Sequence, residues 1–239
     1  MLYDAEGLQN ISETGAYPVA AAAVWEEAAG SARLAAPSRI SRTLQLLVKR
    51  GFDIAASLAL IVVFAPLLLA IALAIRVVDR MPALYCQQRY GRGAVPFTIL
   101  KFRTMTVAEA GRDFTQAVPG DERITRLGAF LRRSSLDELP QLFNVLVGQM
   151  SLVGPRPHAL AMEEDIIARY PRAARRLDMR PGMTGLAQIR GLRGPTRRRD
   201  DLPRRIDADV EYVDDWGLGR DLRILARTPG AWLFGRNAV

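Results

Sequence analysis

Two adjacent carboxylates, Asp137 and Glu138, are the residues of this 239-residue chain whose types and spacing could do chemistry. A carboxylate can attack phosphorus and hold a covalent phosphoryl group. A second carboxylate beside it can hold the divalent cation that neutralises a diphosphate. Arg132 and Arg133 lie close by and would supply positive charge to the oxygens of the transferring group. Together these residue types predict phosphoryl transfer.

The same stretch has a purely structural interpretation. Ser135 is followed three residues later by Glu138, which is the spacing of a capping box at a helix start, where acids are favourable. Pro140 argues against this interpretation, because it would stand where a continuing helix needs a backbone donor. On spacing alone, a helix cap and a catalytic pair both remain open.

Single basic residues in restricted settings are the next candidates. Only Lys49 and Lys101 are lysines among the 33 basic residues, so a lysine kept at Lys101 indicates that a compact ammonium group is needed there. Arg156 stands between Pro155 and Pro157, which restrict the backbone and direct the arginine side chain. A plain surface position for Lys101 and a plain loop around Arg156 are the alternatives.

Two further features carry less information. The turn Pro181-Gly182-Met183-Thr184-Gly185 could approach a nucleotide closely or be a turn only. His158 has no metal-ligand spacing, so we expect a structural role. The single cysteine, Cys86, excludes an internal disulfide framework and makes a zinc site unexpected.

Charge and composition place these candidates on an anion-binding body. Residues 1–38 are acidic and rich in Ala, Gly and Ser, so the rest of the chain carries more than the total net charge of +8. A basic body favours phosphate-rich partners such as lipid headgroups, nucleotides or nucleic acid, although a solvated basic surface has the same composition. We expect residues 1–43 to be a disordered leader rather than a signal peptide.

Residues 54–75 form an uncharged apolar run in which Ser57 is the only polar side chain. At about 1.5 Å per residue, roughly 22 residues reach about 33 Å, enough to cross the hydrocarbon core. Pro66 lies near the middle, and basic residues flank both ends. A bent hairpin over residues 44–80 that enters and leaves on one face explains both features, and a Pro-kinked single pass is the alternative.

After this segment, residues 81–239 read as a mixed soluble domain. Residues 83–88 and 97–102 flank the Gly91-Arg92-Gly93 turn and predict a β-hairpin. Helices are predicted at 124–133, at 140–150, at 159–177 with an interruption at Pro171, and at 207–213. The expected fold class is therefore mainly α with a small β-hairpin (α+β).

The chain from about Lys49 onward resembles the monotopic phosphoglycosyl transferases, bacterial sugar transferases that start exopolysaccharide and O-antigen assembly. Each motif alone is weak, but the ordered set is specific and covers roughly four fifths of the chain. The set is Lys49-Arg50 with Asp53, Lys101-Phe102-Arg103-Thr104-Met105, Arg123-Ile124-Thr125-Arg126, Leu131-Arg132-Arg133, Leu136-Asp137-Glu138-Leu139-Pro140-Gln141 with Asn144, Met150-Ser151-Leu152-Val153-Gly154-Pro155-Arg156-Pro157, and Arg180-Pro181-Gly182-Met183-Thr184-Gly185.

The resemblance implies a ping-pong reaction. Asp137 would attack the β-phosphate of a UDP-sugar and release UMP, and the sugar phosphate would then pass to undecaprenyl phosphate. Glu138 would bind Mg²⁺. Catalysis would also involve Lys101, Arg132 and Arg156, and substrate binding would involve Arg103, Pro155, Pro157, Arg180 and Gln188.

The resemblance also implies a location and a branch of the family. It favours the re-entrant hairpin, with amphipathic helices on the cytoplasmic face of the bacterial inner membrane. Gly191-Leu192-Arg193-Gly194-Pro195-Thr196 and the closing Asn237-Ala238 resemble the exopolysaccharide branch, in which glucose is the first expectation and galactose the second. Two departures stand out: Ala65-Pro66 replaces the usual Ser-Pro at the hairpin break, and Gln149 replaces a common Asp.

Two rival functions stay open on the sequence. One is a membrane-tethered protein that binds anionic lipid or nucleic acid. The chain lacks the interleaved aromatic platform expected for single strands and a recognisable reading helix, so we expect no nucleic-acid partner. The other is an inactive scaffold, which the occupied motif positions disfavour. The sequence leaves a homo-oligomer open.

Overall fold

The computed structural model describes residues 39–106, 120–192, 194 and 201–234. Most of the predicted leader, residues 1–38, lies outside the described residues. Helix α3 begins at Arg39, inside the range 1–43 that the sequence assigned to the leader. The described fold is mostly helical with small sheets, which agrees with the predicted α+β class.

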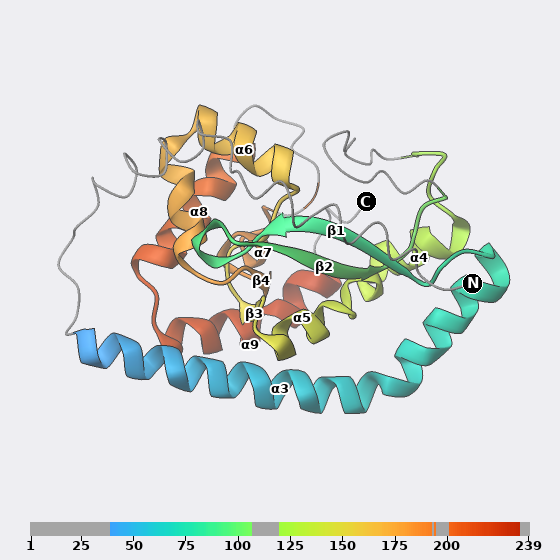
Figure 1. Cartoon of the computed structure of the whole chain (residues 1–239), viewed down its shortest axis with the longest axis horizontal. Coiled ribbons are helices and arrows are strands. Elements are labelled where there is room, and N and C mark those ends of the chain that lie inside the picture. Colours follow the sequence, from blue (N-terminus) through green and yellow to red (C-terminus); the bar gives the residue numbers. More distant parts are fainter. Residues whose placement is uncertain (1–38, 107–119, 193, 195–200, 235–239) are drawn as a thin grey trace, which may run out of the picture.

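The apolar segment forms α3, Arg39–Ala74, and continues into the π-helical turn η1, Ile75–Asp79. Pro66 lies inside the helix, and the chain stays helical through it. Figure 1 shows one long bent helix rather than two helices joined by a turn. A proline within a helix removes a backbone hydrogen bond and favours such a bend.

The surface of α3 is apolar and largely uncovered. Val62, Val63, Leu69 and Leu73 are exposed, each by more than 60%. The segment Arg42–Asp79 is long and apolar enough to cross a membrane, and only 17% of its most apolar window is buried against the rest of the chain. An exposed apolar surface of this kind indicates contact with lipid, so the protein is membrane-associated.

The predicted β-hairpin is confirmed. Strand β1, Leu84–Tyr90, pairs antiparallel with β2, Pro96–Phe102, in a register that sets Leu84 opposite Phe102. The connection is the short turn η2, Arg92–Ala94, in which Gly93 has a φ of +68°. A positive φ suits glycine, so the Gly91-Arg92-Gly93 signal identified the turn for the correct reason.

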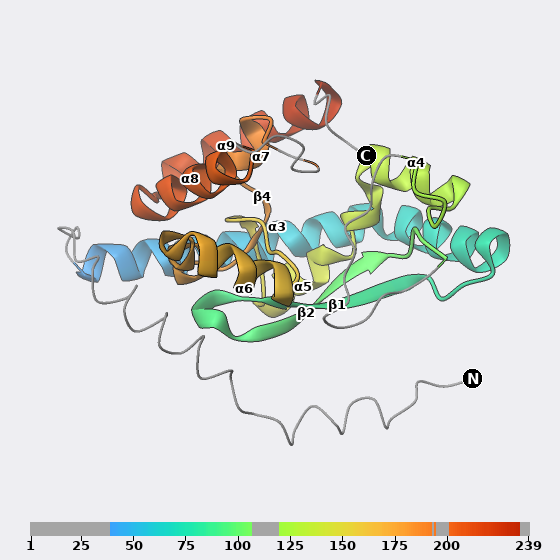
Figure 2. The ribbon, with the colours of Figure 1, turned by 90° about the horizontal axis from the view of Figure 1, so that it is seen from above.

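The remaining elements form a helical body beside α3 and the hairpin (Figures 1 and 2). The predicted helices at 124–133, 140–150 and 159–177 are present, the last one broken at Pro171 as expected, and the predicted helix at 207–213 is the end of a longer helix. The elements are α4 (Arg126–Ser134), η3 (Leu136–Glu138), α5 (Gln141–Val147), β3 (Ser151–Val153), α6 (Leu160–Arg169), η4 (Pro171–Asp178), β4 (Gly182–Thr184), α7 (Leu186–Ile189), α8 (Asp201–Asp214) and α9 (Leu218–Phe234).

A buried polar cluster joins α3 to the C-terminal helix α9, which the sequence did not predict. Lys49 on α3 donates to Asp221 on α9 at 2.6 Å and to the carbonyl of Val153 at 3.0 Å. The Tyr212 hydroxyl donates to the same Asp221 at 2.7 Å. Since these groups are buried and mutually satisfied, they fix α9 against the membrane helix.

Candidate active site

The candidate pair Asp137–Glu138 lies on a tight turn between two helices. Ser135 ends α4 in the left-handed region, with a φ of +56°, and the 3₁₀ turn η3 follows directly. The capping box, one of the two interpretations that the spacing left open, is wrong: the Ser135 side chain makes no capping hydrogen bond. The Glu138 carboxylate instead faces basic side chains, and the left-handed residue turns the chain so that both acids lie between α4 and α5.

Glu138 holds two of the predicted basic residues together. Lys101 on β2 donates to Glu138 Oε1 at 3.0 Å, while Arg156 Nη1 donates to Oε2 at 3.1 Å and Arg156 Nη2 donates to Oε1. The Glu138 carboxylate raises the pKa of Arg156, whereas burial lowers the pKa of Lys101 and Glu138 counteracts part of that effect. Three motifs far apart in the sequence thus converge on one carboxylate.

Asp137 is the neighbouring carboxylate, and it accepts no hydrogen bond from any described residue. Burial, followed by the adjacent Glu138, raises the pKa of Asp137 to about 6, while Lys101, Arg132 and Arg156 act to lower it. Such a carboxylate is ionised at neutral pH yet more basic than an ordinary aspartate. It therefore combines a free oxygen with the electrostatic setting of a nucleophile.

The loop that carries Arg156 packs against the predicted turn Pro181-Gly182-Met183-Thr184-Gly185. Strands β3 and β4 pair in parallel, with Ser151 opposite Gly182 and Val153 opposite Thr184. Gly154 has no room for a side chain, since an added Cβ would lie 2.4 Å from the carbonyl oxygen of Arg180. The two loops, which the sequence left as separate features, form one closely packed unit.

A fully buried cluster lies directly behind this loop. Arg176 donates to Asp209 at 3.0 Å, to Glu163, and to the backbone carbonyl of Arg156 at 2.6 Å. Burial alone would raise the pKa of Glu163, but Arg176 and His158 hold it at about 2. The cluster therefore fixes the main chain at the residue whose side chain binds Glu138.

His158 belongs to this buried cluster, as the sequence predicted when it assigned a structural role. Its Nδ1 lies 2.9 Å from Glu163 Oε2, and the side chain is buried. Burial, followed by the nearby Arg176, lowers the pKa of His158 to about 4. The ring is therefore neutral at pH 7, and its Nδ1–H donates to Glu163 in a hydrogen bond rather than an ion pair.

The sequence missed Arg89 as a residue of the site. Arg89 Nη1 donates to the carbonyl of Pro157 at 3.4 Å, and Nη2 donates to the Gln87 side chain. Burial, followed by repulsion from Arg156, lowers its pKa to about 10. A signal was present, because Gln87 and Arg89 are polar residues at alternate positions of a strand and therefore share one of its faces.

Several other predicted residues make their contacts with nearby backbone. Arg180 Nε donates to the carbonyl of Gly148 at 2.9 Å, Gln188 donates to the carbonyl of Met183 at 3.2 Å, and the Arg103 main chain donates to Ala83 at 2.9 Å. Pro155 and Pro157 border the Arg156 backbone. Arg132 contacts Met105 Sδ at 3.5 Å and acts on Asp137 through its charge.

The described residues contain no group of three His, Cys, Asp or Glu side chains that could form a metal cage. The adjacent Asp137 and Glu138 nevertheless fit the way in which Mg²⁺ is bound in phosphoryl-transfer sites. There one or two carboxylates suffice, because substrate phosphates and water complete the octahedron. Both oxygens of Glu138 already bind cations in this structure, so Mg²⁺ would compete with Lys101 and Arg156 for this carboxylate.

Comparison with known proteins gives a consistent picture. The family model described as bacterial sugar transferase matches residues 44–235. The chain is 53% identical over 190 residues to the UDP-glucose:undecaprenyl-phosphate glucose-1-phosphate transferase of Caulobacter vibrioides, covering 80% of this chain and 71% of that protein. It is 45% identical over 192 residues to the exopolysaccharide production protein PSS of Rhizobium leguminosarum bv. phaseoli, covering 77% of this chain and 94% of that protein.

Some relatives are much longer. The undecaprenyl-phosphate glucose phosphotransferase of Komagataeibacter xylinus is 45% identical over 205 residues, and the match covers 81% of this chain but 37% of that protein. The match to this relative therefore covers about four fifths of this chain and little more than a third of the longer protein.

Proposed function

Because the chain belongs to the bacterial sugar transferase family, we propose that it transfers glucose-1-phosphate from UDP-glucose to undecaprenyl phosphate and releases UMP. The observation that carries this proposal within the fold is the site around Asp137. A free, basic carboxylate lies beside Glu138, Lys101 and Arg156, so a nucleophile and a surplus of positive charge occupy one place.

The first step is attack by an Asp137 oxygen on the β-phosphorus of UDP-glucose. A bond forms between the carboxylate oxygen and phosphorus, and the bond from that phosphorus to the bridging oxygen breaks, so UMP leaves with the electron pair. Lys101, Arg132 and Arg156 lie close enough to Asp137 to act on its charge. They would stabilise the negative charge that spreads over the phosphoryl oxygens in the transition state.

In the second step a phosphate oxygen of undecaprenyl phosphate attacks the same phosphorus. The bond to Asp137 breaks, and the products are undecaprenyl diphosphate glucose and the free carboxylate. Both steps transfer a phosphoryl group between oxygens, so neither needs an oxidant or a reductant. The raised pKa of Asp137 supports attack, and the retained cations support departure of the carboxylate.

Glu138 is the residue that we propose to hold Mg²⁺. The ion would neutralise part of the diphosphate charge when bound. Glu138 now serves as the anion for Lys101 and Arg156. When a diphosphate enters, these two side chains can bind its oxygens, which would leave the Glu138 carboxylate free to hold the metal ion.

The apolar helix α3 gives this chemistry its location. We infer that α3 is re-entrant and that the catalytic domain lies on the cytoplasmic face of the bacterial inner membrane. The bend of α3 and the basic residues at both ends, Lys49 and Arg50 before and Arg76 and Arg80 after, support this arrangement. Accessibility of single cysteines placed at both ends of α3 in spheroplasts tests it, and labelling of one end from the periplasm would refute it.

The test of activity is transfer of labelled glucose phosphate in detergent, with undecaprenyl phosphate, Mg²⁺ and a panel of UDP-sugars. We expect release of UMP with UDP-glucose, a covalent sugar phosphate on the wild type when the acceptor is omitted, and no adduct with Asp137→Asn. Asp165→Asn, in the exposed ion pair with Arg169, is the matched control and should keep full activity. An adduct trapped on another residue would refute the assignment of Asp137.

A further inference from the structure

A cavity of about 150 Å³ between α7 and α9 is lined by four arginines. Its floor is apolar and consists of Leu186, Ile189 and Ile224. The basic lining, called the arginine pocket below, consists of Arg190, Arg220, Arg223 and Arg227. None of these residues takes part in the site around Asp137, so a high density of positive charge lies at a place that the transfer reaction does not use.

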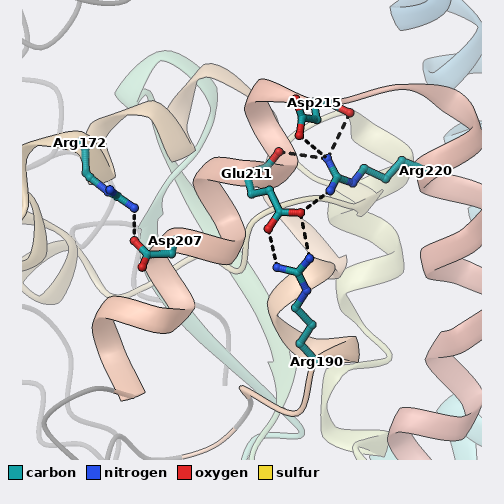
Figure 3. Close-up of polar contacts among 6 residues, drawn as sticks. All are labelled: Arg172, Arg190, Asp207, Glu211, Asp215 and Arg220. Carbon is teal, nitrogen blue, oxygen red and sulfur yellow. Dashed lines mark hydrogen bonds and ion pairs between the residues drawn. The ribbon is translucent and has the colours of Figure 1, made fainter.

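One carboxylate on α8 holds two of the four arginines in place. Glu211 accepts two hydrogen bonds from Arg190, at 2.5 and 2.8 Å, and one from Arg220 at 2.5 Å. Figure 3 shows Glu211 between these two guanidinium groups, with Asp215 next to Arg220. The hydrogen bond from Arg190, more than any other contact, lowers the pKa of Glu211. The two arginines are therefore oriented in advance, which reduces the entropy lost when they bind an anion.

The other two arginines provide the surplus charge. Arg223 and Arg227 are exposed, one helical turn apart on α9, and neither forms an ion pair with any residue in the described part of the chain. Four arginines thus face only two carboxylates, Glu211 and Asp215. Side chains at i and i+4 lie on one face of a helix, so both uncompensated guanidinium groups border the same cavity.

The location of α9 indicates where the anion comes from. Asp221 on α9 is bound to Lys49 on the membrane helix α3 at 2.6 Å, in a buried contact. The next residue, Leu222, is 58% exposed, as are the lipid-facing residues Leu47 and Val48 of α3 to a similar degree. Helix α9 is thus fixed beside a membrane segment and carries an exposed leucine and a row of arginines. These features are typical of a helix that lies at the level of the lipid headgroups.

We propose that the arginine pocket binds the phosphate group of an anionic phospholipid headgroup at the membrane surface. Guanidinium groups bind phosphate oxygens through charge-assisted and often paired hydrogen bonds, and the apolar floor can contact the glycerol and upper acyl carbons. The bound lipid would hold α7 and the C-terminal helix α9 at a defined depth beside the membrane.

Native mass spectrometry of the full chain in a neutral detergent can test this, with phosphatidylglycerol and phosphatidylcholine added in equal amounts. We expect the wild type to retain phosphatidylglycerol in preference to phosphatidylcholine. The double variant Arg223→Gln/Arg227→Gln should lose roughly tenfold or more in affinity for phosphatidylglycerol, since each basic residue near a surface contributes measurably to anionic-lipid binding. Millimolar inorganic phosphate in a parallel sample separates a site for free phosphate from a site for a lipid headgroup.

The matched control is Arg169→Gln/Arg172→Gln, which removes the same charge from two exposed arginines that each have their own aspartate (Figure 3 shows Arg172 with Asp207). This control should retain phosphatidylglycerol like the wild type. Equal loss in both double variants, or no loss in either, would overturn the proposal, as would binding of inorganic phosphate without any preference for the lipid. Since Asp137 is untouched, transfer at saturating substrates should persist in both variants, and this readout is independent of the lipid result.

Discussion

Two arginine–carboxylate clusters of this protein lie back to back and differ in their balance of charge. In the buried cluster Arg176 forms ion pairs with both Glu163 and Asp209, beside the neutral His158. The cluster around Asp137 has several cations near two carboxylates. In the first the carboxylates are already paired with a buried cation, whereas the second has positive charge in excess and can accept a diphosphate.

The two clusters are joined by a hydrogen bond from Arg176 to the carbonyl of Arg156. Arg176 and Arg156 therefore have different roles around the same segment of main chain. Arg176 is satisfied on all sides and holds the main chain, and Arg156 is half-open and directs its side chain at Glu138. Burial and matched partners make an arginine structural, while partial exposure and a shared partner leave it free to bind substrate.

The largest effect should follow from breaking the buried cluster. Arg176→Met leaves Glu163 and Asp209 buried without their cation, which typically costs about 3–5 kcal/mol of stability. We expect a clear loss of unfolding free energy in denaturant titrations of the detergent-solubilised protein. Arg172→Gln, which breaks an exposed ion pair with Asp207, should change stability by less than about 1 kcal/mol. Equal effects of the two variants would contradict a distinct role for the buried cluster.

Substitution of Arg156 should lower activity rather than stability. Arg156→Gln removes a guanidinium group whose charge acts on Asp137, from a side chain that is 27% exposed. We expect transfer to fall by about 10²–10³-fold, the usual loss for one group that stabilises a transition-state charge, with stability nearly unchanged. Initial rates and unfolding curves of the same preparation distinguish the two outcomes. A variant that unfolds like Arg176→Met but keeps full activity per folded molecule would show that Arg156 is structural.

His158 provides a more selective test of the buried cluster through pH. Its pKa is about 4 in the folded protein against 6.5 for the free side chain, so the unfolded chain binds more protons between these values. Stability from this residue is present above pH 6.5 and is lost as the pH falls to about 4, a change of about 3 kcal/mol. Asp209, with its pKa raised to about 6, acts in the opposite sense over part of this range. The measurement is therefore the difference between wild type and His158→Gln at several pH values, and it should shrink as the pH falls.

The sequence predicted the parts of the fold that depend on local patterns. The β-hairpin followed from a glycine turn between short, partly β-branched or aromatic runs, and the break at Pro171 followed from the missing donor of proline. The candidate residues Asp137, Glu138, Lys101 and Arg156 were chosen from motifs, and the structure brings them together. That assembly depends on contacts between elements far apart in the chain, so spacing alone could not reveal it.

The misses have physical causes of the same kind. The capping box at Ser135 failed because this residue has a left-handed backbone, whereas a capping side chain is normally carried by an extended residue. The parallel pairing of β3 with β4 was not predicted because each strand has three residues and lies inside a motif. Helix α9 contains Pro229 and was passed over, although its buried Asp221 and Ile224 fix it to the body. Arg89 was missed because its contact with the Arg156 loop is to a backbone group, the carbonyl of Pro157.

The smallest effect we predict is a shift in the pH dependence of transfer, and it bears directly on the surplus of charge near Asp137. As the proposed nucleophile, Asp137 must be ionised, and burial together with Glu138 raises its pKa to about 6, so activity should fall as the pH drops through about 6. Glu138→Gln removes a negative charge that raises the pKa of Asp137, so the fall in activity should move to lower pH. Lys101→Met removes a positive charge that lowers the pKa of Asp137, so the fall in activity should move to higher pH. We expect each shift to be roughly one pH unit or less. The residual activity of each variant, measured from pH 4.5 to 8, gives the pH at which its activity falls to half. Shifts in the same direction would mean that the acid limb belongs to another group and that the balance of charge around Asp137 does not set its reactivity.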